Sequence, residues 1–133
     1  MEKSSRRRKV KMIDVIILLL ISVILGSLGQ IAMKKGLTDS GGIELREILS
    51  TKLFSIVFQR YVFIGITFYL ISTLLWFVIL SKAELSFAYP LIALGYIITV
   101  FLASIFFKEA ITPFRWFGIL LILGGAILIM ARF

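Results

Sequence analysis

Weakly polar side chains recur at helical spacing inside the apolar segments of this sequence. Ser22, Gly26, Gln30 and Lys34 follow one another at intervals of four residues, so they share one face of a helix. Two later segments carry similar faces, one with Gly65, Tyr69, Ser72 and Trp76 and one with Tyr89, Ala93, Tyr96 and Ala103. Hydroxyls, an amide and aromatic rings can hold an uncharged polar group through hydrogen bonds and stacking. We therefore expect three helices to line a groove for a small polar or amphipathic molecule.

Each of these residues also has a purely structural interpretation. Ser and Gly allow helices to pack closely, and Tyr and Trp favour the membrane interfaces. For Gln30 we favour the binding role, because an amide among apolar groups needs a partner. Pro90 follows Tyr89 within an apolar segment, and its missing N–H leaves a carbonyl near Ser86 for a polar cavity, unless it only kinks the helix.

The chemistry that is missing excludes several functions. The chain has no Cys and no His, which removes thiol chemistry, imidazole catalysis and the commonest metal ligands. The apolar segments contain no charged residue, although such residues usually carry proton or ion coupling in membranes. We expect neither an enzyme nor a bound cofactor or metal, and we expect no nucleic-acid partner despite the net charge of +8.

Four long apolar segments must position these faces. Stretches of 19, 21, 23 and 16 residues carry no charge, and 60% of all residues are hydrophobic. At about 1.5 Å per residue the first three can cross a hydrocarbon core of about 30 Å, whereas the fourth is short. The sequence predicts an all-α integral membrane protein with transmembrane helices over about 13–34, 61–81, 86–107 and 114–132. These helices form a single domain over 15–133, after a basic tail over 1–14.

The connections and the last helix suggest further contacts. Apolar and charged residues alternate at helical spacing over about 43–59, which predicts an amphipathic helix on the membrane surface or an ordinary connector. Gly118, Ile122 and Gly125 form a small-residue face in the fourth helix. Such a face predicts a contact in a homodimer or heterodimer, with packing inside the chain as the alternative.

The cations suggest an orientation. Six of the fifteen lie in the first eleven residues, beside a membrane segment, and so favour a cytoplasmic N-terminus. With four spans the C-terminus would be cytoplasmic as well. We expect a multi-pass protein of the cytoplasmic membrane of a prokaryote.

Several motifs resemble a known family. Gly29-Gln30-Ile31-Ala32-Met33-Lys34 is similar to the drug/metabolite transporter superfamily, in its four-helix branch with the small multidrug resistance proteins. Ala88-Tyr89-Pro90-Leu91 and Phe107-Lys108-Glu109-Ala110-Ile111-Thr112-Pro113, with Trp116, Gly118 and Gly124-Gly125, resemble the EamA-like subunits of aminoarabinose–phospho-undecaprenol flippases most closely. The small multidrug exporters are known for a carboxylate in the first helix. Gly26 stands in its place here, which favours the flippase branch.

The resemblance implies a flippase that moves a polyprenyl-phosphate-linked monosaccharide across the membrane, paired with itself or with a similar four-helix subunit. The lipid tail can stay in the bilayer, so the protein needs to shelter only the headgroup. Lys34 ends the polar face and is the best-placed cation for the phosphate. Glu109 could bind an amino or hydroxyl group of the sugar, or pair with Lys108 or Lys34. The predicted substrate-binding residues are Gln30, Lys34, Ser72, Trp76, Tyr89, Pro90, Tyr96 and Glu109.

Two other functions remain open on the sequence. The shared fold allows export of organic cations or small metabolites, which pH-driven efflux of a lipophilic cation would reveal. A membrane assembly subunit without transport activity is the third possibility. In that case disruption of Gly118 and Gly125 would abolish the phenotype, while changes at Gln30 and Lys34 would not.

Overall fold

The computed structural model describes the backbone of residues 2–131 and the side chains of residues 12–131. Four long helices coincide with the predicted membrane-spanning segments: α1 (Glu2–Asp39), α3 (Arg60–Lys82), α4 (Leu85–Phe106) and α5 (Pro113–Met130). All four are long and apolar enough to span a bilayer. No strand occurs in the described part of the chain. The predicted all-α membrane architecture is confirmed.

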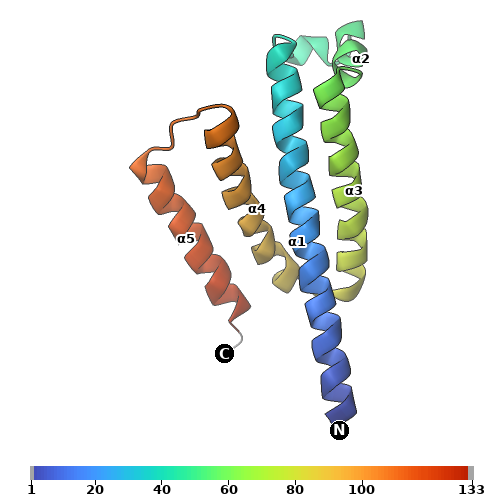
Figure 1. The fold of residues 1–133 in the computed structure, drawn as a ribbon, viewed down its shortest axis with the longest axis vertical. Coiled ribbons are helices and arrows are strands. Elements are labelled where there is room, and N and C mark those ends of the chain that lie inside the picture. Colours follow the sequence, from blue (N-terminus) through green and yellow to red (C-terminus); the bar gives the residue numbers. More distant parts are fainter. Residues whose placement is uncertain (1, 132–133) are drawn as a thin grey trace.

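The helices alternate in direction (Figure 1). α1 begins and α5 ends on one side of the molecule, and the α1–α3 and α4–α5 connections lie on the opposite side. α1 begins at Glu2, inside the predicted tail over 1–14, and continues without a break past the predicted end of its span at residue 34. The tail cations themselves, Lys3, Arg6, Arg7, Arg8, Lys9 and Lys11, have side chains outside the described residues.

Local signals at the helix ends explain these bounds. Gly41 and Gly42 both adopt φ of +79°, a left-handed conformation that favours glycine, and they stop α1. Gln59 caps α3 by accepting a hydrogen bond from the Val62 N–H at 2.9 Å. Thr112 caps α5, and Pro113 occupies its first turn, where a missing N–H costs nothing.

The connection between α1 and α3 differs from the single helix predicted over 43–59. It consists of a 3₁₀ turn, η1 (Leu45–Glu47), and a short helix, α2 (Thr51–Val57). Ser50 separates them, because its hydroxyl accepts a hydrogen bond from the Lys52 N–H at 3.3 Å and so starts a new helix. The apolar side chains of Leu45, Leu49, Phe54 and Phe58 are exposed.

A seam of small residues joins α1 to α3. Ser22 and Ser72 exchange hydrogen bonds: each hydroxyl donates to the other residue's carbonyl, at 3.0 and 2.7 Å. Further along, the backbones at Gly29 and Gly65 approach so closely that a Cβ on Gly65 would lie 2.6 Å from the Gly29 carbonyl oxygen. Glycine on both helices therefore sets the spacing between α1 and α3.

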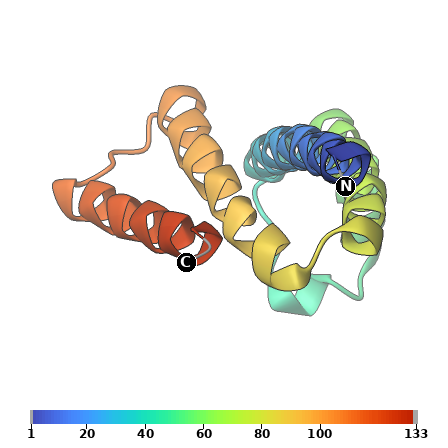
Figure 2. The same cartoon turned by 90° about the horizontal axis from the view of Figure 1, so that it is seen from below.

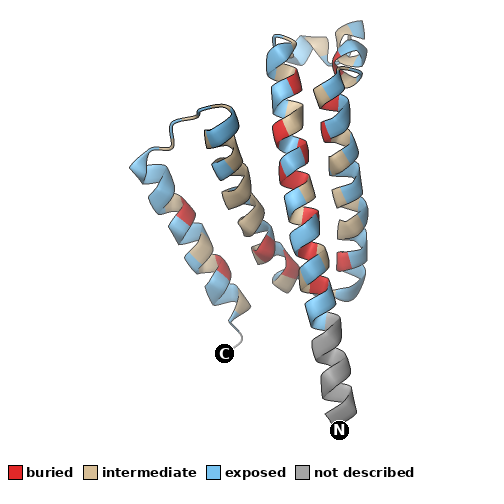
Figure 3. Cartoon of the chain, in the orientation of Figure 1, coloured by how far each residue is buried: buried red, intermediate tan, exposed pale blue. Residues whose placement is uncertain are grey.

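α4 leaves this pair at an angle, as Figures 1 and 2 show. Near the α3–α4 connection, Val15, Leu19, Ile79, Ala88 and Leu91 form a buried cluster shared by α1, α3 and α4. From there α3 and α4 diverge, with α1 between them, and α5 packs against α4. Much of each long helix is exposed (Figure 3). The exposed residues include many large apolar ones on all four helices, as expected where lipid covers them.

Candidate functional site

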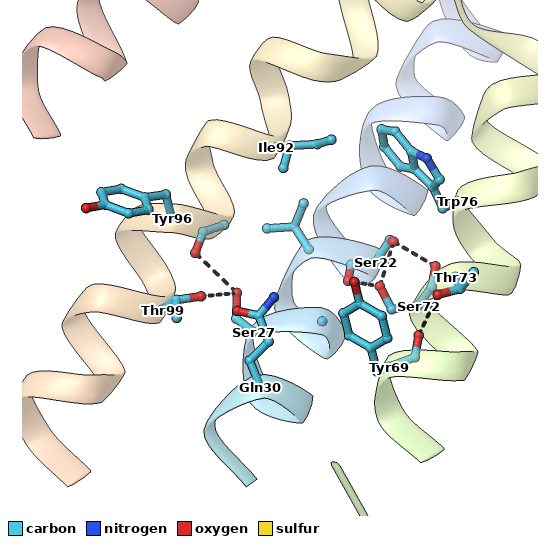
Figure 4. Close-up of a pocket in the computed structure, with 13 residues that line it drawn as sticks. Ser22, Ser27, Gln30, Tyr69, Ser72, Thr73, Trp76, Ile92, Tyr96 and Thr99 are labelled. Atoms are coloured by element: carbon cyan, nitrogen blue, oxygen red, sulfur yellow. Dashed lines mark hydrogen bonds between the residues drawn. The ribbon is translucent and has the colours of Figure 1, made fainter. Parts of the chain in front are cut away.

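The divergence of α3 and α4 opens a cavity of about 390 Å³ beside α1. Figure 4 shows the three helices contributing side chains to it. Its lining consists of Ser22, Val23, Gly26, Ser27, Gln30, Tyr69, Ser72, Thr73, Trp76, Ile92, Gly95, Tyr96 and Thr99. No charged side chain is among them. We call it the polar cavity.

Most hydroxyls in this wall already have partners. Besides the Ser22–Ser72 pair, Thr99 donates to the Ser27 hydroxyl at 3.0 Å, and Ser27 donates to the Gly95 carbonyl at 3.3 Å. Thr73 donates to the carbonyl of Tyr69 at 2.9 Å, within its own helix. These hydroxyls therefore stabilise contacts between and within the helices, and they are not free to bind another molecule.

Four other polar groups in the wall remain available. The Gln30 amide, the hydroxyls of Tyr69 and Tyr96 and the indole N–H of Trp76 have no hydrogen-bond partner among the described residues. In Figure 4 Gln30 and Tyr69 lie near each other, whereas Tyr96 points away from both. An amide and two phenols can donate and accept hydrogen bonds from sugar hydroxyls, and the aromatic faces can stack on a sugar ring.

A second cavity, of about 350 Å³, adjoins the first and shares Gln30, Tyr96 and Thr99 with it. It lies between α1, α4, α5 and the α4–α5 loop, and we call it the charged cavity. Lys34, Glu109 and Arg115 contribute its charges. The Lys34 ammonium forms an ion pair with Glu109 and lies 4.9 Å from the centre of the Phe107 ring. Of the partners considered for Glu109, the structure selects Lys34.

The predicted site residues divide into two groups. Gln30, Ser72, Trp76 and Tyr96 line the polar cavity, and Lys34 and Glu109 line the charged one. Tyr89 and Pro90 line neither of the two cavities. Tyr89 instead meets the Trp76 ring edge-on, with ring centres 5.9 Å apart. α4 continues through Pro90 without interruption.

The small-residue face of α5 remains open. A Cβ added to Gly118, Gly124 or Gly125 would meet no atom within 4 Å, and Ile122 is 45% exposed. Packing inside the chain, the alternative to a subunit contact, does not occur at these positions. The subunit contact stays a prediction.

Sequence reasoning missed Ser27, which ties α1 to α4. Ser27 lies five residues after Ser22, so it falls outside the face that begins with Ser22. Its partners, Gly95 and Thr99, are four residues apart and share a face of α4. The shared face of Gly95 and Thr99 was the feature of the sequence that could have indicated this contact.

The fold and these cavities define a multi-pass helical membrane protein with polar cavities among apolar helices, which is an arrangement typical of transporters. The sequence matches the EamA-like transporter family over residues 46–131, and the chain belongs to that family. The resemblance found in the motifs is thereby confirmed. The described residues contain no group of three or more Cys, Asp or Glu that could hold a metal ion.

Bacterial relatives extend the similarity to nearly the whole chain. A probable 4-amino-4-deoxy-L-arabinose-phosphoundecaprenol flippase subunit ArnE of Pseudomonas fluorescens (strain Pf0-1) is 32% identical, over 84% of this chain and 93% of the relative. A probable subunit ArnF of the same flippase from Shewanella sediminis is 30% identical over 88% of each chain. The ArnF subunit of Proteus mirabilis is 29% identical over 84% of this chain and 87% of its own. No solved structure matches the chain.

Proposed function

We propose that this protein is a subunit of a flippase that moves a polyprenyl-phosphate-linked monosaccharide across the cytoplasmic membrane. The observation that carries the proposal is the uncharged polar cavity of about 390 Å³ that three membrane-spanning helices line. Its size falls within the range of about 300–1,000 Å³ that is usual for small-ligand sites. The relatives named as flippase subunits support the same substrate class.

The polar cavity suits a sugar because its available groups are neutral. Gln30, Tyr69 and Tyr96 offer hydrogen bonds in place of those that the sugar hydroxyls lose on leaving water. The polyprenyl chain needs no such shelter and remains in the bilayer, between the diverging helices. The protein then needs to lower the free-energy barrier to crossing the membrane only for the headgroup.

The charged cavity suits the phosphate. A phosphodiester keeps one negative charge, and Lys34 and Arg115 supply two cations against the single carboxylate of Glu109. This excess of positive charge stands next to the polar cavity, so phosphate and sugar can occupy adjacent sites. Lys34 is 49% exposed and can therefore be reached.

The chain is proposed to work with a second four-helix subunit, a copy of itself or a relative. α5 packs against α4 and leaves its glycine face open, and four helices give the two cavities only partial walls. With the basic tail in the cytoplasm, both ends of the chain lie on that side, and the charged cavity lies toward the opposite face.

Export of an organic cation is a weaker candidate for this site. A cation in the polar cavity would need a counter-charge, and no carboxylate lines that cavity. Glycine stands at position 26, where an added Cβ would lie 3.1 Å from the Ser72 hydroxyl oxygen. The carboxylate expected of a small multidrug exporter is absent from this wall.

Transport into sealed membrane vesicles tests the proposal. Vesicles from cells that produce the chain should take up a short-chain, water-soluble polyprenyl-phosphate monosaccharide, and Gln30→Leu should reduce the initial rate by about tenfold. That loss corresponds to one or two hydrogen bonds of about 1 kcal/mol each. Leu28→Ala, a change on the same helix outside both cavities, is the matched control.

The outcome separates three cases. Uptake that depends on Gln30 but not on Leu28 supports the flippase. Efflux of a lipophilic cation driven by a pH gradient, without uptake of the sugar lipid, would replace it with an exporter. Failure of the chain to support either transport, while a partner glycosyltransferase needs it for assembly, would make it a scaffold.

A further inference from the structure

Two cations of the α1–α3 pair lie against one aromatic ring where these helices reach the end of their spans. The Lys35 ammonium is 4.9 Å from the centre of the Tyr61 ring, and the Arg60 guanidinium carbon is 5.1 Å from it. Both distances fall within the roughly 6 Å over which a ring attracts a cation. The Arg60 guanidinium also donates a hydrogen bond to the Tyr61 hydroxyl at 3.4 Å. Tyr61 therefore holds one cation from each helix at a single place on the surface, and we call Lys35, Arg60 and Tyr61 the Tyr61 cluster.

The Tyr61 cluster carries an excess of positive charge. Lys35 pairs with Asp39 at 3.6 Å, and the two side chains are 47% and 45% exposed. An ion pair with this degree of exposure is weak, so Lys35 can turn to another anion. Arg60 forms no ion pair within the described residues. Lys35, Asp39 and Arg60 together leave one positive charge, which a single anion would neutralise.

The cluster lies at the expected depth of the lipid headgroups. Arg60 is the first residue of an apolar, span-length helix, and cations and tyrosines are typical of the membrane interface. Because α1 and α3 run in opposite directions (Figure 1), the span continues after Tyr61 and before Lys35. Ile64 lies about one turn after Tyr61, Leu28 lies about two turns before Lys35, and both are exposed. A charged site thus lies above an apolar surface.

We propose that the Tyr61 cluster binds the phosphate of an anionic phospholipid of the bilayer. The two cations donate charge-assisted hydrogen bonds to the phosphate oxygens, and the N-terminal end of α3 adds a partial positive charge. A free phosphate ion offers the same chemistry, but only a lipid also covers the apolar surface beside Ile64 and Leu28. A zwitterionic lipid binds less tightly, because its ammonium group is repelled by the cations. No residue of the cluster lines the polar or the charged cavity, so the site is separate from that of the proposed flippase substrate.

Native mass spectrometry of the full chain, released from micelles of an uncharged detergent, tests this inference. The wild-type chain should bind its first molecule of phosphatidylglycerol about tenfold more tightly than phosphatidylcholine, the factor expected of one charge-assisted phosphate contact. Lys35→Gln/Arg60→Gln should bring the ratio of the two affinities close to one. Lys35→Arg/Arg60→Lys, which keeps both charges, should preserve the ratio. Far-ultraviolet circular dichroism of each variant checks that its helix content equals that of the wild-type chain.

Arg46→Gln is the matched control, because Arg46 is an exposed cation of the surface connection between α1 and α3 and has no ion pair or ring contact within the described residues. It should leave the ratio unchanged. A preference that survives in Lys35→Gln/Arg60→Gln, or that falls equally in Arg46→Gln, would overturn the site. Displacement of phosphatidylglycerol by inorganic phosphate would show a site for free anions and overturn the lipid assignment. Loss of the preference in Lys34→Gln would place the lipid in the charged cavity and overturn it as well.

Discussion

The close contact between Gly29 in α1 and Gly65 in α3 allows a quantitative prediction of the loss of stability when one of them is replaced. A Cβ on Gly65 would lie 2.6 Å from the Gly29 carbonyl oxygen and 2.7 Å from the Met33 nitrogen, whereas ordinary contacts begin near 3.4 Å. Both neighbours are backbone atoms, which cannot rotate away. Gly65→Ala therefore forces the two helices apart by roughly 0.8 Å, the difference between the two distances.

The energetic cost follows from this displacement. Overpacking of a close-packed site typically costs about 1–3 kcal/mol. Separation of the helices also stretches the reciprocal bonds between Ser22 and Ser72, which now measure 2.7–3.0 Å. Each interhelical hydrogen bond in a membrane protein contributes about 0.6 kcal/mol on average. We expect Gly65→Ala to lose about 2 kcal/mol or more of unfolding free energy.

The matched control is Gly124→Ala. Gly124 lies in α5, where an added Cβ meets nothing within 4 Å, so alanine should stabilise the helix by about 0.5–1 kcal/mol. Reversible unfolding of both variants in mixed detergent micelles, followed by far-ultraviolet circular dichroism, compares them with the wild-type chain. Equal stabilities of Gly65→Ala and Gly124→Ala would refute the seam as the element that fixes the α1–α3 spacing.

Three further predictions concern the connections and the subunit contact. The hydrogen bond from Lys52 lowers the pKa of the Glu47 carboxyl, so its stabilising effect is present above the ordinary carboxyl pKa and is lost as the pH falls through the lowered value. Proteolysis of the connection over 45–58 should accelerate on acidification, and a flat pH profile would contradict this. Lys108 adopts φ of +52°, a left-handed backbone conformation that is strained for any residue with a Cβ. Lys108→Gly should therefore raise the unfolding free energy by about 1 kcal/mol in denaturant titrations. A lower unfolding free energy would show that Lys108 is not strained. Gly125→Leu should abolish crosslinking between subunits in membranes while leaving monomer stability unchanged, and undiminished crosslinking would place the contact elsewhere.

The sequence predicted four long apolar helices correctly, because hydrophobicity and charge determine such helices directly. Asp14, Lys34, Arg60 and Lys82 bracket the first two apolar stretches. The ends of α3, α4 and α5 lie within two residues of the predicted limits, whereas α1 begins at Glu2 and ends at Asp39, well outside the predicted 13–34. The surface connection departs from the prediction as well. Its apolar periodicity predicted a single helix, but Ser50 can cap a helix as readily as it can sit inside one, and capping prevails here.

Periodicity indicated which candidate site residues share a helical face, but not which of them form hydrogen bonds with one another. Periodicity placed Ser22, Gln30 and Ser72 on faces that do meet, and the structure brings them to one cavity. It could not decide which hydroxyls face each other across helices, because that depends on the angle between α1 and α3. Ser72 consequently bonds to Ser22, whereas the amide of Gln30 remains available.

Tyr89 and Glu109 illustrate the same limit. Tyr89 shares a helical face with Tyr96, but the divergence of α4 from α3 carries Tyr96 into the cavities while Tyr89 packs on Trp76. The partner of Glu109 depends on the path of the α4–α5 loop. The sequence does not show how far that loop lies from Lys34. It shows only that Lys34 is a cation near the end of the first helix, so that a pair with Glu109 was one of the alternatives.

In the proposed transport cycle, a sugar headgroup passes through the polar cavity between α1, α3 and α4. Photocrosslinking tests it most directly, with a polyprenyl-phosphate sugar that carries a photoreactive group on the sugar ring. After illumination in membranes, the labelled peptides should fall within 22–30, 69–76 and 92–99, and unlabelled sugar lipid should compete. Label confined to the lipid-facing surface of α5, at Leu120, Leu121 and Ile127, would contradict the account.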